Sequence, residues 1–359
     1  MKNLLLIITV TISTIIFSGC PLIKPNPKYH DGVFPDYPTN FLKINSAYDD
    51  YNSALPIIQH NQHLIFSSNR NSLGQEFDIV GDNLNIWWDM ESGLLTVDNT
   101  QDYYDINFID TLLKRINTPF NEFGPYALKY WINDSINNYL RYDILTYSTT
   151  DEQNNYKSKF AYFKTTNELT GTYHGPFSIK MTETLNDAQY ISFLNTGIIE
   201  DHKEFNPSDF SQMILNVNDN GNVGIYSIEL PPNDNFIDML KDDSGTAPTI
   251  IPILNSSSQD KCPFVNKHFM VFTSNRPGGF GGYDLYYSWF INGVWEEPTN
   301  FGAGINTEYD EFRPVTIGVY GFVNDLMIFS SNRPGGKGGF DLYYVGLPFK
   351  IQNLITINE

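Results

Sequence analysis

The glycine-rich segment "SSNRPGGKGGFDLYY" at residues 330–344 constrains the fold most, because residues 274–287 repeat it almost unchanged as "SNRPGGFGGYDLYY". A weaker copy, "SSNRNSLGQEFDIV", occupies residues 67–80. Segments that recur along a chain indicate structural units that pack against one another. We therefore assign a structural role to the repeat residues Asn69, Arg70, Asp78, Asn275, Arg276, Asp284, Asn332, Arg333 and Asp341.

The segment before each glycine-rich loop recurs as well. Residues 305–314, "INTEYDEFRP", match "INTPFNEFGP" at 116–125, and fainter copies complete five unit starts near 45, 117, 186, 255 and 306. Each unit contains strand-like runs separated by turns, and Asn292-Gly293 is typical of a type I′ hairpin. The pattern predicts an all-β fold: a single β-propeller over residues 37–350, with five blades of four antiparallel strands.

Ring closure is predicted from one further copy. The segment "EPTNFGAGIN" at 297–306, which leaves the fourth unit, resembles "YPTNFLKIN" at 37–45, ahead of the first unit. A strand there has no sheet of its own, so we expect it to complete the fifth blade and remove a free edge. The tail, residues 351–359, competes for that position, and six blades are the alternative.

The chain begins "MKNLLLIITVTISTIIFSGC", with one lysine, an apolar run and small residues before Cys20. The run is shorter than the roughly 20 apolar residues of a membrane span, which favours an export signal. "FSGC" resembles the cleavage site of bacterial lipoproteins. The resemblance implies removal of residues 1–19, acylation of Cys20 and a flexible tether over 20–36. A plain secretory signal with an incidental cysteine is the alternative.

Charge and motifs narrow the partners. The formal net charge of −19 argues against nucleic acid, so the membrane, reached through a lipid on Cys20, and an envelope protein or glycan remain as partners. No phosphate-binding loop, dinucleotide fingerprint or G-x-S-x-G motif occurs, and no cofactor is expected.

A family resemblance follows from "YDEFRP" and "MIFSSNRPGGKGGFDLYY" in residues 309–344. These motifs resemble the TolB-type, WD-like (PD40-like) propeller repeats of bacterial envelope proteins, although the "SPDG" turn of TolB is absent. The resemblance implies a propeller lipoprotein of the outer membrane, facing the periplasm or the cell surface. It says little about the partner.

Four acidic residues occupy one equivalent position, ahead of the first strand of four units: Asp50, Glu122, Asp260 and Glu311. They could line one mouth of the central funnel as a weak metal site or as catalytic carboxylates. The favoured interpretation is structural, with contacts to the loop arginines, because catalysis breaks symmetry whereas these residues repeat. No catalytic residue is assigned.

Aromatic residues in the insertion at 81–115 are the candidates for partner binding: Trp87, Trp88, Tyr103 and Tyr104. Covering the edge of a blade is the structural alternative. The main hypothesis is a non-catalytic, lipid-anchored envelope propeller that binds a protein or glycan. The alternatives are a five-bladed glycoside hydrolase with funnel carboxylates and an accessory subunit of an outer-membrane or secretion complex.

Overall fold

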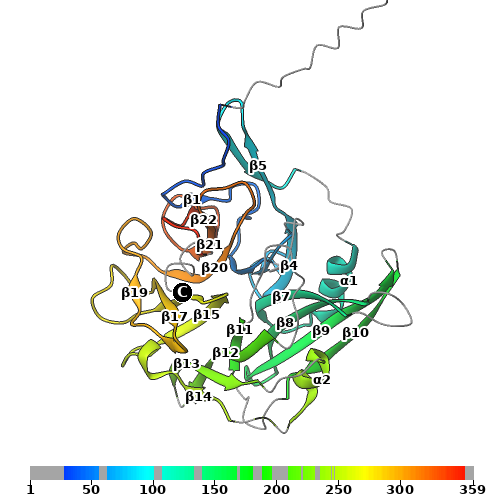
Figure 1. Cartoon of the computed structure of the whole chain (residues 1–359). Helices are drawn as coiled ribbons and strands as arrows, with labels where there is room; N and C mark the ends of the chain where they lie inside the picture. The colour runs from blue at the N-terminus through cyan, green and yellow to red at the C-terminus, as the bar shows by residue number, and fades with distance from the viewer. Residues whose placement is uncertain are drawn as a thin grey trace, which may run out of the picture.

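The computed structural model describes residues 28–55, 63–100, 107–132, 140–167, 170–180, 188–195, 209–219, 221–230, 235–243, 245 and 247–351. Its sheets surround a common centre, and a separate hairpin that contains β5 projects from one side (Figure 1). The predicted signal peptide, Cys20, Tyr103, Tyr104 and the tail from 352 lie outside the described residues. No helix within the described ranges is long and apolar enough to cross a membrane.

Five antiparallel sheets form the blades, and each is followed outward from its innermost strand. Blade 1 contains β2 (Asp50–Ala54), β3 (His63–Ser68) and β4 (Asp78–Asn83). Blade 2 contains β7 (Glu122–Ile132), β8 (Leu140–Thr150), β9 (Tyr156–Asn167) and β10 (Thr170–Ser178). Blade 3 contains β11 (Ala188–Asn195), β12 (Phe210–Asp219), β13 (Asn222–Glu229) and β14 (Thr249–Ile250).

Blade 4 contains β15 (Asp260–Asn266), β16 (Phe269–Ser274) and β17 (Asp284–Ile291), with β18 (Val294–Trp295) and β19 (Thr299–Asn300) both paired to β17. Blade 5 contains β20 (Glu311–Ile317), β21 (Leu326–Ser331), β22 (Asp341–Gly346) and β1 (Thr39–Asn40). The remaining elements are the hairpin β5 (Asn85–Asp89) and β6 (Leu94–Asp98), α1 (Asn107–Ile116), α2 (Phe236–Lys241) and a 3-10 turn, Pro252–Leu254. The predicted five-bladed propeller is confirmed.

Closure occurs as predicted, through the N-terminal strand. β1 pairs antiparallel with β22, and the Asn40 side chain donates to Asp341 Oδ2 at 2.8 Å. In blade 4 the equivalent Asn300 makes the same 2.8 Å bond to Asp284. The repeated "PTN" segments therefore perform one task twice, and the first copy joins the two ends of the ring.

Asparagines at the unit starts join neighbouring blades. Asn306 accepts from the backbone N–H of Leu285 at 2.8 Å and donates to its carbonyl at 3.0 Å, so it binds blade 4 like an added strand residue. Three other unit-start asparagines make the same pair of bonds, namely Asn45, Asn117 and Asn255. Because each satisfies a buried peptide group, the repeated asparagine is explained by blade-to-blade adhesion.

The predicted tether is shorter than expected. Residues 29–36 pack on the propeller: Phe34 is buried, stacks on Phe322 with ring centroids 4.2 Å apart, and donates its N–H to Asn324. The expectation of a flexible segment through residue 36 is corrected, because Phe34 has an apolar partner that lies distant in the sequence.

Candidate active site

The four repeated carboxylates start the innermost strands of four blades, and each is fully buried. Three form ion pairs inside their own blade: Asp50 with Arg70 at 2.6 Å, Asp260 with Arg276 at 2.6 Å, and Glu311 with Arg333 at 2.9 Å. Each arginine also donates to a carbonyl of the loop that precedes the carboxylate, at Ile44, Leu254 and Ile305. These pairs fix the loops, which accords with the structural interpretation.

The repeat residues around these pairs are structural as well. The side chains of Asn69, Asn275 and Asn332 accept from the backbone N–H before each carboxylate. Asp284 and Asp341 accept from backbone N–H groups of the glycine-rich loops. Within the described ranges, no group of three or more His, Cys, Asp or Glu side chains could hold a metal ion.

Glu122 in blade 2 is different, because no arginine faces it. Strand pairing places Thr149 opposite Glu122, as Ser68 lies opposite Asp50, so Asp151 occupies the position that corresponds to Arg70. Glu122 instead accepts from the hydroxyls of Thr118 at 2.6 Å and Thr149 at 2.9 Å, and from the Thr118 N–H at 3.2 Å. Neutral donors replace the cation.

This environment favours the protonated acid. Burial raises the pKa of Glu122 to about 7, and the nearby Asp78 carboxylate raises it as well, against the lowering effect of the threonine hydrogen bonds. Burial also raises the pKa of Glu311, but there Arg333 opposes the shift. Glu122 therefore combines complete burial, a neighbouring carboxylate and neutral hydrogen-bond donors.

A band of half-buried aromatic rings, the aromatic collar, runs past these carboxylates. It joins blades in pairs: Phe77 contacts Phe123, Phe340 contacts Tyr51, and Tyr283 contacts Phe312, with centroids 5.3, 6.0 and 4.7 Å apart. Further ring contacts link these pairs to one another and add Tyr156 beside Phe123. Lys261 lies over the rings of Tyr283 and Phe312. The collar therefore spans blades 2, 1, 5 and 4.

The next residue along each innermost strand closes the propeller axis. All five strands have a bulge there, with a residue at positive φ: Asn52, Gly124, Tyr190, Cys262 and Arg313. Asn52 donates to the Tyr190 hydroxyl at 3.2 Å, and the fully buried Arg313 lies over the Tyr190 ring and donates to the Pro125 carbonyl. These contacts join blades that are not neighbours, so the side chains meet at the axis.

Glycine is required at the axial position of blade 2. A Cβ on Gly124 would lie 2.6 Å from the Tyr190 ring, and the φ of +57° disfavours other residues. The axis is therefore filled by four side chains, and the collar and the carboxylates lie at one mouth of it. Sequence reasoning missed this site, because the residues of one axial column differ in type.

The predicted partner-binding aromatics lie elsewhere. Trp88 packs against Tyr29 and Phe322, whereas Trp87 is 64% exposed on the outer face of the β5–β6 hairpin. Neither belongs to the collar. The hairpin leaves β4 at Asn83, five residues beyond Asp78, and β4 starts beside the collar residue Phe77. The hairpin and the collar are therefore at opposite ends of that strand.

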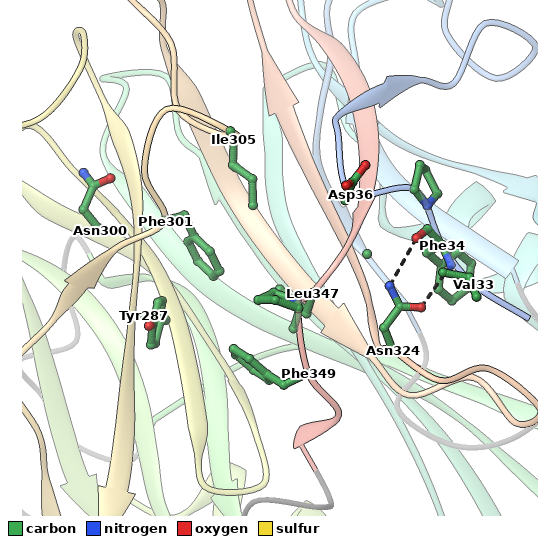
Figure 2. Close-up of a pocket in the computed structure, with 14 residues that line it drawn as sticks. Val33, Phe34, Asp36, Tyr287, Asn300, Phe301, Ile305, Asn324, Leu347 and Phe349 are labelled. Carbon is green, nitrogen blue, oxygen red and sulfur yellow. Dashed lines mark hydrogen bonds between the residues drawn. The ribbon is translucent and has the colours of Figure 1, made fainter.

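A pocket of about 620 Å³ lies between blades 4 and 5 (Figure 2). Tyr287, Phe301 and Phe349 supply its aromatic wall, and Asn324 on the far side binds the backbone of Phe34. Asp36 is the only carboxylate among its lining residues. A pair of carboxylates, which glycoside hydrolysis needs, is thus absent from the lining of this pocket.

No family model and no curated protein matches this chain. Among solved structures it is similar to the catalytic domain of the Coprinopsis cinerea GH62 α-L-arabinofuranosidase, with 10% identity over 89% of this chain and 98% of that chain, and a TM-score of 0.45. It is also similar to the GH43 protein BlXynB of Bacillus licheniformis, with 9% identity over 88% of this chain and 55% of that one, and a TM-score of 0.44.

A third similar structure is CoXyl43, a GH43 β-xylosidase/α-arabinofuranosidase from a compost microbial metagenome, with 7% identity, coverage of 88% and 96%, and a TM-score of 0.44. The identification as a TolB-type repeat protein is therefore wrong: the structural neighbours are GH43 and GH62 proteins. The same finding overturns the expectation of a non-catalytic scaffold. At such low similarity we transfer no residue, substrate or mechanism from these proteins, and chemistry is argued from the site alone.

Proposed function

We propose that this chain is a glycoside hydrolase in which Glu122 donates the proton and Asp78 is the second carboxylate. The observation that carries the proposal is the loss of the arginine in blade 2, which leaves a buried carboxylic acid beside another carboxylate and the aromatic collar. The repeating ion pairs of blades 1, 4 and 5 argued against catalysis, and blade 2 supplies the asymmetry that catalysis needs.

The two carboxyl groups belong to neighbouring blades that are joined by a direct bond. The N–H of Glu122 donates to the carbonyl of Phe77 at 2.7 Å, and Asp78 follows Phe77 in the chain. Phe77 and Phe123 lie beside the pair, and aromatic rings of this kind offer flat apolar surfaces to a ligand. The blade 1–blade 2 boundary thus contains both carboxylates and a surface for a sugar ring.

The roles follow from charge. A protonated Glu122 can transfer its proton to the glycosidic oxygen as the bond to the anomeric carbon breaks. Asp78 then stabilises the positive charge on the sugar, either by taking a proton from an attacking water or by attacking the anomeric carbon itself. After the first route, proton exchange with solvent restores both groups. After the second, water activated by Glu122 releases the sugar.

Access to Glu122 requires movement, because its side chain is fully buried in this structure. The proposal therefore includes displacement of the Phe77–Phe123 pair when substrate binds. Loss of one ring contact costs about 0.5–1.5 kcal/mol, which substrate binding can offset.

Hydrolysis is tested on pentose-containing polysaccharides, chosen because the structural neighbours are named arabinofuranosidases and xylosidases. Reducing-sugar release is measured for the wild type, Glu122→Gln and Asp78→Asn. The matched controls are Glu311→Gln and Asp284→Asn, the equivalent residues of blades 5 and 4. We expect E122Q to lose about 10²- to 10⁴-fold in kcat, and the folded controls to retain activity. No hydrolysis by the wild type, or equal loss in the controls, would contradict the proposal.

For location, we propose a lipoprotein of the bacterial cell envelope, supported by "FSGC" at residues 17–20 and by the preceding apolar run. Cys20→Ala is expected to move the protein from the membrane to the soluble fraction, and mass spectrometry of the wild type to find an acylated N-terminal cysteine. Retention of C20A on membranes would contradict this.

A further inference from the structure

The β5–β6 hairpin has one packed face and one open face. Ile86, Trp88, Leu95 and Val97 pack against the core. On the opposite face, Trp87 and Leu94 are 64% and 66% exposed, and Met90 in the turn is 48% exposed. Trp87 pairs with Thr96 and Leu94 pairs with Asp89 across the hairpin, so the two apolar side chains share one face. Large apolar residues gathered in this way mark an interaction surface.

The first described residues of the chain are attached to this hairpin. The N–H of Tyr29 donates to the Met90 carbonyl at 2.9 Å, and the Trp88 indole donates to the Tyr29 carbonyl at 3.3 Å. The edges of the Tyr29 and Trp88 rings also meet, with centroids 6.4 Å apart. The chain therefore reaches the propeller at the hairpin.

A second loop adds exposed apolar side chains at the same end. Phe322 packs against Trp88, with centroids 6.3 Å apart, and its neighbours Tyr320 and Val323 are 86% and 51% exposed. We call Trp87, Met90, Leu94, Tyr320 and Val323 the apolar end. In Figure 1 the β5 hairpin extends away from the five blades, which leaves it accessible to a surface larger than the protein.

We infer that the apolar end lies on the surface of the lipid bilayer that holds acylated Cys20. Eight residues separate Cys20 from Lys28 and can span at most about 29 Å when fully extended. A lipid on Cys20 therefore keeps the hairpin within that distance of the membrane. The inference depends on the proposed lipidation, and it is independent of glycosidase activity.

The chemistry of the apolar end suits the interfacial layer of the bilayer. Tryptophan and tyrosine favour the headgroup level, where an apolar ring is buried while its polar atom stays hydrated. Asp89 and Glu91 in the hairpin turn oppose deeper insertion. Because the whole chain carries a formal net charge of −19, anionic lipids provide no attraction, and zwitterionic phospholipids are the expected surface.

Orientation of the candidate active site follows from strand direction. β4 runs from Asp78, at the collar, to Asn83, where the chain turns into the hairpin. With the apolar end on the membrane, the collar points away from the lipid. A lipid-anchored chain held in this way presents Glu122 and Asp78 toward soluble or extracellular polysaccharide.

Trp87 fluorescence tests the inference in the full-length acylated protein, reconstituted in phosphatidylcholine vesicles whose acyl chains carry bromine near the headgroup. Bromine quenches tryptophan on contact. We expect quenching in the wild type, loss of most of it in Trp87→Phe, and wild-type quenching in Phe280→Ser. Phe280 is the matched control because it is 48% exposed on the glycine-rich loop of blade 4, at the collar end.

Vesicle flotation accompanies the measurement. Protein that floats with the vesicles but shows no quenching of Trp87 would overturn the inference, because the hairpin would then face away from the lipid. Wild-type protein that does not float would overturn it through the lipid anchor. Equal quenching in W87F would assign the contact to another tryptophan and would also overturn it. Hydrolysis assays on the same samples report separately on the proposed function.

Discussion

In blade 5 the buried carboxylate Glu311 binds Arg333 at 2.9 Å, whereas in blade 2 the equivalent Glu122 receives only hydroxyl and amide donors because Asp151 occupies the arginine position. Blade 2 also differs at the axis, where Gly124 occupies a position that carries a side chain in the other four blades. One backbone position thus holds an ion pair that stabilises a loop in three blades and a protonatable acid in the fourth. The difference teaches that, in a repeat protein, function is sought in the repeat that has lost its structural partner.

The largest effect is expected from breaking an ion pair in a paired blade. Arg333→Met leaves Glu311 buried without a cation, and removal of one partner of a buried pair costs about 3–5 kcal/mol. Urea denaturation measures the change in the free energy of unfolding. The blade 2 comparison is Thr149→Val, which removes one neutral hydrogen bond and should cost about 1 kcal/mol. Equal costs would show that the two sites do not differ.

Gly124→Ala tests the axial difference. The added Cβ meets the Tyr190 ring at 2.6 Å, so we expect a loss of about 2–4 kcal/mol from overpacking and positive-φ strain together. Gly278→Ala is the control, because Gly278 also has positive φ but a Cβ added there would meet no atom within 4 Å. Thermal unfolding of both variants separates the clash from the strain, and a G124A variant no less stable than G278A would contradict the packed axis.

Stability should depend on pH through Glu122. Its pKa is about 7 in the folded chain against an ordinary value of 4.5, so the folded state binds more protons between these values. The resulting stabilisation is complete below pH 4.5 and is lost as the pH rises through 7, by on the order of 2 kcal/mol. Urea denaturation of the wild type and E122Q at pH 5 and pH 8 measures it. A pH dependence that is unchanged in E122Q would assign the effect to other groups.

The smallest effect is expected from converting blade 2 to the paired form. In Asp151→Arg the new guanidinium can reach Glu122 as Arg70 reaches Asp50, which should stabilise the fold by about 1 kcal/mol and lower the pKa of Glu122. The pH dependence of stability described above should shrink, and hydrolysis should fall. D151R with wild-type activity and wild-type pH dependence would show that Asp151 does not occupy the arginine position in function.

The blades and the ring closure were predictable because the signals are local. Turn glycines, apolar strands and the "PTN" copies each depend on short segments, and the bonds of Asn40 and Asn300 to Asp341 and Asp284 are the same bond made twice. Short loops of this kind satisfy requirements common to many propellers, so they indicated the fold but gave the wrong family.

The candidate site was only partly predictable. Glu122 was among the four acidic positions, but the absence of its arginine appears only when strand pairing sets Thr149 opposite it, because the blade 2 loop lacks the glycine-rich motif. The axial contacts of Arg313 and Tyr190 join distant blades through side chains of different types. The packing of Phe34 on Phe322 likewise depends on a residue distant in the sequence, which is why the predicted tether was too long.

The central claim is that Glu122 holds a proton at slightly acidic pH without a cationic partner. Infrared difference spectra of wild type minus E122Q test it directly, because a protonated carboxyl group has a carbonyl stretch that a carboxylate lacks. We predict a protonated-carboxyl band at pH 6 that disappears at pH 8, on either side of the value of about 7. A spectrum at pH 6 that shows only the carboxylate would contradict the account and would make blade 2 another structural variant of the repeat.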